Sequence, residues 1–176
     1  MKHLPFYDMS VTVTSSVDDN LSQSLNEGLQ TSNGLKYNQL SNTKGIRFIQ
    51  LNVVSLLKHL DEIKSILYSN DIHICALNET RLDDGINNHE IDIPHYSVIR
   101  KDRARNGGGV AIYVHDSIDF QQLEHDSMEY LEAILISINL KNTKPLLFLN
   151  WYRPPNSKSD ILHVYEDLLA FMEAFN

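Results

Sequence analysis

Polar side chains stand at the ends of two apolar segments of this chain. GIRFIQLN ends on Asn52, and IHICALNE ends on Glu79. Because an unpaired buried carboxylate is unfavourable, Glu79 requires an ion-pair partner, a helix cap or a bound cation. Arg81 follows closely and could form a structural ion pair with it. The pattern leaves a cation site and an ion pair both open, and Asn52 could also serve a turn at its strand end.

Two further segments add groups that could contact phosphate. LFLNWYRPP carries Tyr152 and Arg153, and both side-chain types can donate hydrogen bonds to phosphoryl oxygens. RKDRARNGGGVAIYV places basic residues before three glycines: Arg100, Lys101, Arg103 and Arg105 before Gly107, Gly108 and Gly109. The basic run is either a solvated face or a phosphate contact. No Gly-Lys-Ser/Thr sequence follows the glycines, so they are not a P-loop but a turn or a place of close backbone approach.

The elements that must position these residues follow from the apolar periodicity. Residues 45–54 and 72–77 are typical of buried strands. Between them Leu56, Leu60, Ile63 and Leu67 recur at helical spacing, and Ser55 is a suitable N-cap. A strand, a helix and a strand within so short a span predict a βαβ unit with parallel strands. Parallel neighbours end at one edge of a sheet, so we expect Asn52 and Glu79 to lie together there.

The second half of the chain predicts antiparallel strands that follow a polar loop at 81–94. The expected strands cover 96–100, 110–115, 132–140 and 145–151, and a short polar turn joins the last two as a hairpin. An amphipathic helix is expected over 159–175. Its predicted apolar face holds Leu162, Tyr165, Leu169 and Met172.

The composition separates a globular part from the start of the chain. The chain has 176 residues, 42% of them apolar, and a net charge of −8, which argues against general binding of polyanions. Residues 1–43 carry few large apolar side chains, so we expect a disordered or weakly structured segment with at most a short helix near 21–29. The single cysteine, Cys75, excludes a disulfide framework, and no Cys/His spacing indicates zinc. No signal peptide or span of about 20 apolar residues is visible, which predicts a soluble, intracellular protein without a membrane partner.

Four segments, LNVVSL, LNETRL, RKDRARNGGGVAIYV and NWYRPP, occur in this order. The series resembles the endonuclease domain of non-LTR retrotransposons, which belongs to the exonuclease–endonuclease–phosphatase superfamily, and the resemblance covers residues 45–176. It implies an α/β (α+β) fold in which two sheets pack as a sandwich flanked by helices. Residues 44–176 would form a partial domain of this kind, truncated at its C-terminus.

For the matching positions the resemblance implies Mg²⁺-dependent nicking of DNA that serves target-primed reverse transcription. Glu79 would bind the metal, Asn52 would bond to the metal shell or the scissile phosphate, and Tyr152 would contact the phosphate region. These three are the expected catalytic residues, and the candidate phosphate contacts are Arg81, Arg103, Arg105 and Arg153. DNA is the expected partner. A reverse transcriptase domain is expected in the full-length protein, and the family suggests the nucleus.

Two motifs of the family are missing after NWYRPP: an Asp-x-Asn strand and a final Asp-His pair. In the family these groups orient the attacking water and transfer protons, so we expect the chain alone to be inactive or nearly so. We also expect it to hold roughly the first sheet, with an exposed apolar face. The alternatives are a non-catalytic interaction module that docks through that face, and a phosphatase or phosphodiesterase acting on small phosphoesters.

Overall fold

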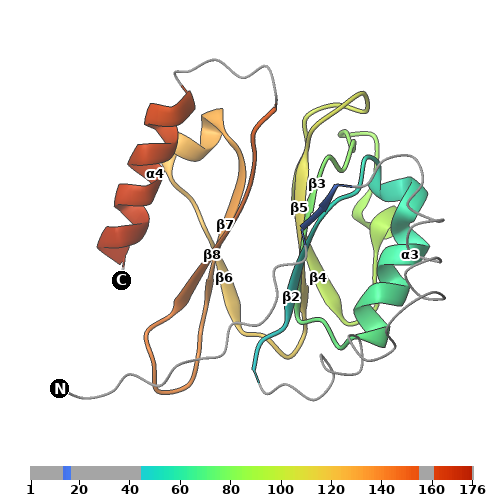
Figure 1. The fold of residues 1–176 in the computed structure, drawn as a ribbon, viewed down its shortest axis with the longest axis horizontal. Coiled ribbons are helices and arrows are strands. Elements are labelled where there is room, and N and C mark those ends of the chain that lie inside the picture. Colours follow the sequence, from blue (N-terminus) through green and yellow to red (C-terminus); the bar gives the residue numbers. More distant parts are fainter. Residues whose placement is uncertain (1–13, 17–44, 155–160, 176) are drawn as a thin grey trace.

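The computed structural model describes residues 14–16, 45–154 and 161–175. They form two β-sheets that pack face to face, each covered on its outer side by a helix (Figure 1). Helix α3 (Leu56–Ser69) lies outside one sheet, and helix α4 (Ile161–Phe175) lies outside the other. The expected two-sheet sandwich flanked by helices is therefore confirmed.

The first sheet contains the βαβ unit that the sequence predicts. Its strand order is β1-β2-β3-β5-β4, with β1 at Thr14–Ser16, β2 at Phe48–Asn52, β3 at Ile74–Asn78, β5 at Val110–His115 and β4 at Tyr96–Lys101. Strands β1, β2 and β3 run parallel, whereas β5 runs antiparallel to both β3 and β4. Strand β1 falls within the segment that was expected to be weakly structured; residues 1–13 and 17–43, with the helix expected near 21–29, lie outside the described residues.

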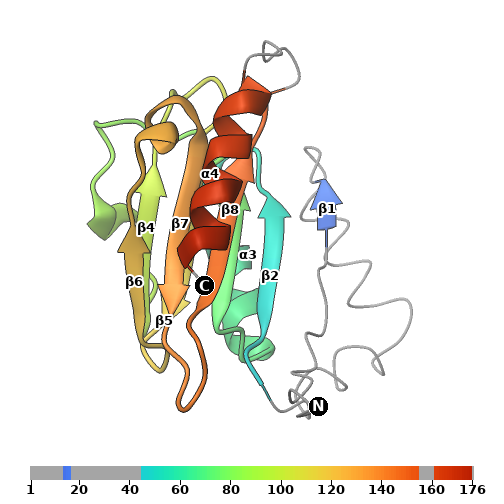
Figure 2. The same cartoon turned by 90° about the vertical axis from the view of Figure 1, so that its left-hand side faces the viewer.

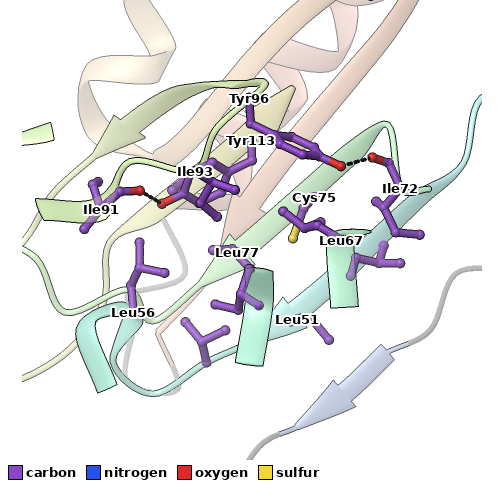
Figure 3. Packing of buried hydrophobic residues seen from close by; sticks show 14 of the residues in the cluster. Leu51, Leu56, Leu67, Ile72, Cys75, Leu77, Ile91, Ile93, Tyr96 and Tyr113 are labelled. Atoms are coloured by element: carbon purple, nitrogen blue, oxygen red, sulfur yellow. Dashed lines mark hydrogen bonds between the residues drawn. The ribbon is translucent and has the colours of Figure 1, made fainter. Parts of the chain in front are cut away.

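Strand alternation divides the side chains of the first sheet between two cores. On one face Leu51, Cys75, Leu77 and Tyr113 are buried against Leu56, Ile63 and Leu67 of α3 (Figure 3). The loop at 81–94 contains the short helix η1 (Asn88–Ile91) and adds Ile91 and Ile93 to this core. The Tyr113 hydroxyl donates to the Ile91 carbonyl at 2.6 Å, which fixes the loop against the sheet.

The start of α3 differs from the prediction. Ser55 occupies the N-cap position but makes no side-chain capping hydrogen bond. Instead, the backbone N–H of Leu56 donates to the carbonyl of Thr80 at 2.9 Å. The backbone that follows β3 therefore caps α3, which ties the helix start to the segment that carries Glu79.

The second sheet is antiparallel and has the order β6-β7-β8, with β6 at Phe120–Leu123, β7 at Glu132–Ile138 and β8 at Leu146–Tyr152. The predicted hairpin is present as β7 and β8. Strand β6 escaped prediction because it is short and its central residues, Gln121 and Gln122, are polar and exposed. The short helix η2 (Asp126–Tyr130) connects β6 to β7.

The expectation that the chain holds only the first sheet with an exposed apolar face is wrong. Strands β7 and β8 cover that face, and Ile74, Ile112 and Val114 of the first sheet are buried with Ile134 and Ile136 of the second. Phe48 and Phe148 meet edge to face between the sheets, with ring centroids 5.7 Å apart. The interaction module that would dock through this face thereby loses its basis.

Helix α4 runs across the outer face of β7 and β8 (Figure 2). Leu168 is fully buried there, with Val164, Phe171 and Met172 packed around it, and Tyr165 stacks on Trp151 at 4.0 Å. The prediction was right for Tyr165 and Met172 but wrong for Leu169, which is 37% exposed. The side chain of Leu162 lies outside the described residues. The buried stripe of α4 therefore centres on Leu168.

Candidate functional site

The parallel register of β2 and β3 brings the two strand-end residues of the sequence together. Asn52 pairs with Asn78, and Glu79 follows directly. The N–H of Val53 donates to the Asn78 carbonyl at 2.9 Å, so the two strand ends stay joined. The expected meeting of Asn52 and Glu79 at one edge of the sheet is thus observed.

Tyr152 reaches this edge from the other sheet. Its hydroxyl donates to Glu79 Oε1 at 2.6 Å, across a sequence separation of 73 residues. Two residues earlier on β8, the buried Asn150 donates from Nδ2 to the carbonyls of Leu77 and Ala111, both at 3.1 Å. Asn150 therefore locks β8 against β3 and β5 next to the Tyr152–Glu79 contact.

The backbone at Glu79 turns sharply. Glu79 has φ 56° and Arg81 has φ 54°, both in the left-handed region that non-glycine residues rarely adopt. The glycine-rich loop holds this turn, because the N–H of Thr80 donates to Gly109 O at 3.2 Å and that of Arg81 to Gly108 O at 3.0 Å. Such a conformation persists only where surrounding contacts determine it. The sequence left open whether the glycines form a turn or allow a close backbone approach, and in the structure they have both roles.

The electrostatics of the pair favour a charged Glu79 and a protonated Tyr152. The hydrogen bond from Tyr152 lowers the pKa of Glu79, burial opposes this, and Asn52 and Arg81 add smaller lowering effects. Burial, together with the bond to Glu79, raises the pKa of Tyr152 to about 12. Tyr152 therefore remains a hydrogen-bond donor at neutral pH, and Glu79 remains an acceptor.

Arg81 forms the ion pair that the sequence left open. Its Nη2 lies 3.4 Å from Glu79 Oε2, and the Glu79 side chain is 20% exposed. The distance is long for a charge-assisted hydrogen bond. The carboxylate is thus partnered by one short bond from Tyr152 and one looser contact with Arg81, and it stays open to solvent.

The residues at this edge suit a hard cation. The Oδ1 atom of Asn52 is buried and has no hydrogen-bond partner in the described part of the structure, although its amide lies within bonding range of Glu79. Mg²⁺ uses oxygen ligands and usually combines one or two carboxylates with water and substrate phosphate. Among the described residues no group of three His, Cys, Asp or Glu side chains could hold a metal. Glu79 and Asn52 therefore fit a Mg²⁺ ion that keeps most of its water or phosphate ligands.

The predicted phosphate contacts divide into two groups. Arg81 lies at Glu79, and Arg103 is close enough to Tyr152 to lower its pKa. Arg105 is instead paired with Asp83 at 2.5 Å, and Arg153 is exposed just beyond the end of β8. The structure brings Asn52, Glu79, Arg81, Tyr152 and Arg103 together and leaves Arg105 and Arg153 outside this cluster.

The side chains of Arg100 and Lys101 in the basic run already have partners within the protein. Arg100 lies 3.3 Å from Asp102 and donates to the Ile86 carbonyl, while Lys101 donates to the Met128 carbonyl. These partners make a general basic patch a poor description of this surface. Arg103, at 42% side-chain exposure, is the member whose charge acts on Tyr152.

Three residues of the site escaped sequence reasoning: Thr80, Glu132 and Asn150. Glu132 opens strand β7 and accepts hydrogen bonds from Arg103 and from the Gly109 N–H, both at 2.7 Å. Asn150 and Glu132 did leave a signal, since each is a polar residue within or at the start of an apolar strand.

Two cavities of about 440 and 310 Å³ lie elsewhere, lined by residues around Lys101 and around His73. Neither includes Glu79, whose side chain is 20% exposed.

Comparison with known proteins supports the fold. No protein-family model matches the chain, and no curated protein matches it. Among solved structures, the endonuclease domain of TRAS1, a telomere-specific non-LTR retrotransposon, matches with a TM-score of 0.55 and 14% identity, over 73% of this chain and 54% of that one. The AP endonuclease LMAP from Leishmania major matches with a TM-score of 0.54 and 15% identity, over 74% of this chain and 47% of that one.

These likenesses show that the chain shares its fold with the two endonuclease structures, which agrees with the fold that the resemblance of its motifs implies. The chain spans about half the length of the two solved structures. None of the helices in the described ranges is long and apolar enough to cross a bilayer.

Proposed function

We propose that this chain carries the metal- and phosphate-binding part of a DNA endonuclease site of retrotransposon type. The observation that carries the proposal is the contact between Tyr152 and Glu79, which joins two sheets at the edge where Asn52 also ends its strand. A fold shared with two endonucleases supports it. DNA is the proposed partner, with a reverse transcriptase domain in the full-length protein and a nuclear location.

In this proposal Glu79 and Asn52 hold Mg²⁺ through oxygen atoms. When bound, the ion would polarise the phosphate and stabilise charge on the leaving oxygen. Tyr152 keeps its proton, and once phosphate is bound its single O–H would turn from Glu79 to a phosphoryl oxygen, while Arg81 and Arg103 add positive charge. Arg105 and Arg153 would contact phosphates further along the DNA. Residues 44–176 form the domain that does this, and within residues 1–43 strand β1 joins its first sheet.

The proposal includes weak catalysis by the chain alone. No histidine is among the hydrogen-bond or charge partners of Glu79 in the described residues, and the Asp-x-Asn strand and Asp-His pair of the family do not occur after NWYRPP in this sequence. A positioned general base contributes a factor of about 10²–10⁴ to a rate. We therefore expect binding of DNA and Mg²⁺ with little or no turnover.

Fluorescence anisotropy with a fluorescein-labelled DNA duplex tests the binding part. We expect the unchanged chain to bind the duplex more tightly with Mg²⁺ than with EDTA, and Glu79→Ala to remove that difference. Glu173→Ala, which removes an exposed carboxylate on α4, is the matched control and should leave the Mg²⁺ effect intact. A folded chain with no affinity for the duplex in either buffer would refute the proposal.

Plasmid nicking tests the catalytic part. We expect no nicking above background with Mg²⁺. Nicking that disappears in Glu79→Ala would overturn the expected inactivity and establish an active endonuclease. Turnover of bis(p-nitrophenyl) phosphate without affinity for DNA would favour the alternative of an enzyme for small phosphoesters.

A further inference from the structure

Glu132 is a partly buried carboxylate whose two oxygen atoms both have partners. Its side chain is 16% exposed. Oε1 accepts a hydrogen bond from Arg103 Nη1, and Oε2 accepts one from the Gly109 N–H, both at 2.7 Å. These are short, charge-assisted bonds. Glu132 thus links the Arg103 guanidinium to the glycine-rich loop.

The guanidinium of Arg103 rests on the backbone of that loop. Its Nε donates to the Gly107 carbonyl at 3.0 Å. A Cβ atom at Gly108, where φ is +76°, would lie 2.4 Å from Arg103 Nε and 2.6 Å from Glu132 Oε2. Any side chain there would displace the pair. The close approach of Arg103 and Glu132 therefore explains why glycine occupies this position.

The same loop supports the turn at Glu79. Gly108 and Gly109 accept the hydrogen bonds from Arg81 and Thr80. Glu132 also pairs with Tyr152 across β7 and β8. The five residues Arg103, Gly107, Gly108, Gly109 and Glu132, here termed the Arg103 cluster, consequently adjoin both members of the Tyr152–Glu79 contact.

We propose that Glu132 is a positioning residue that holds the Arg103 guanidinium beside Tyr152, where it binds a phosphate of the DNA backbone. The inference rests on the proposed function, since it assumes DNA as the ligand. Among the described residues, protein contacts use Nε and one N–H of Nη1 of Arg103, which leaves Nη2 to donate to a phosphate. A planar guanidinium fixed at one edge retains less freedom to lose on binding than a mobile one.

The negative charge of Glu132 allows a positioning role to be distinguished from a purely electrostatic one. If Glu132 acted on DNA only through its charge, its neutralisation would remove a repulsion and tighten binding. If it positions Arg103, neutralisation weakens binding despite the lost negative charge. The two roles predict changes of opposite sign in the dissociation constant.

A double-mutant cycle on the full chain tests the proposal, with the labelled duplex in EDTA so that no strand is cut. We expect Glu132→Gln to raise the dissociation constant about tenfold, the size of one charge-assisted hydrogen bond. In an Arg103→Ala background the same substitution should not weaken binding further. Arg103→Lys, which keeps the charge but cannot make both contacts, should weaken binding nearly as much as Arg103→Ala. Glu129→Gln removes an exposed carboxylate of η2 and is the control for charge.

Each outcome separates the inference from the proposed function. Tighter or unchanged binding by Glu132→Gln, or equal weakening in the Arg103→Ala background, overturns the role of Glu132 while DNA binding by the unchanged chain still stands. No binding by the unchanged, folded chain overturns both. Far-UV circular dichroism and thermal unfolding of every variant identify loss of fold, and Arg103→Lys then supplies a test that leaves Glu132 in place.

Discussion

Glu79 and Tyr152 show how a residue's chemistry depends on its partner. Each is a common side chain, yet the 2.6 Å bond between them lowers the pKa of Glu79, and burial together with this bond raises the pKa of Tyr152. The pair is thereby fixed as acceptor and donor over the whole neutral range. Arg81 supplies a positive charge that faces the Glu79 carboxylate. Under the proposed function, Mg²⁺ and phosphate would displace this 3.4 Å contact between Arg81 and Glu79.

His73, at the opposite end of β3 from Glu79, gives a pH-dependent prediction. Burial lowers its pKa from 6.5, and the charges of Arg47 and His115 act in the same direction. Its Nδ1 accepts the Arg47 N–H at 3.1 Å, which requires the neutral ring. The unfolded state therefore binds more protons than the folded state below about pH 6.5. The stability that His73 contributes is fully present above that pH and is lost as the pH falls toward the lower folded value.

Urea denaturation at a series of pH values between 7.5 and 5 measures this effect. In His73→Asn the amide oxygen can accept the Arg47 N–H at any pH, so the decline in unfolding free energy should be shallower than in the unchanged chain. His89→Asn changes an exposed histidine of η1 and should leave the slope as it is. Equal slopes in the unchanged chain and His73→Asn would contradict the prediction.

In helix α4, two neighbouring leucines differ sharply in burial. Leu168 is fully buried against β7 and β8, whereas Leu169 is 37% exposed. Sequence periodicity favoured Leu169, because leucines at both positions leave the centre of the stripe uncertain by one residue. Stacking of Tyr165 on Trp151 sets the rotation of the helix on the sheet.

The two leucines provide a matched pair of substitutions. Leu168→Ala should lower the free energy of unfolding by about 2–5 kcal/mol through lost burial and the remaining cavity. Leu169→Ala should change it by no more than about 0.5 kcal/mol. Chemical denaturation followed by circular dichroism measures both, and similar losses from the two variants would mean that α4 packs in another rotation.

For the whole molecule, the core between the sheets decides whether the fold acts as one unit. Ile134 and Ile136 pack against Ile74 and Ile112, and Asn150 bonds to carbonyls of the first sheet. The candidate site exists only where both sheets are in place, since Tyr152 and Glu79 belong to different ones. Integrity of the site and cooperativity of the fold are therefore linked.

Coincident unfolding transitions are the expected consequence. Trp151 is the single tryptophan and lies on β8, so its fluorescence reports on the second sheet, while far-UV circular dichroism reports on both. The two probes should give one midpoint in the unchanged chain, and a lower shared midpoint in Ile136→Ala, with a loss of about 2–5 kcal/mol. Separate midpoints would show that the sheets unfold independently.

The sequence by itself determined the local architecture. The βαβ unit, the hairpin of β7 and β8 and the meeting of Asn52 with Glu79 follow from apolar periodicity and from the geometry of parallel strands, which act over short stretches of chain. The motifs also indicated the fold, with its two sheets and flanking helices. Arg81, as the ion-pair partner of Glu79, was within reach of the same reasoning.

Tertiary structure alone decided which distant groups meet. Tyr152 and Glu79 are 73 residues apart and lie on different sheets, and so do Asn150 and Leu77. Their contacts depend on how one sheet lies on the other, which no local pattern encodes. Packing between elements also decided three further features: the cover over the inner face of the first sheet, the burial of Leu168 in place of Leu169, and the contact of Glu132 with Arg103. Each is set by packing between elements, where a shift of one residue changes the partner.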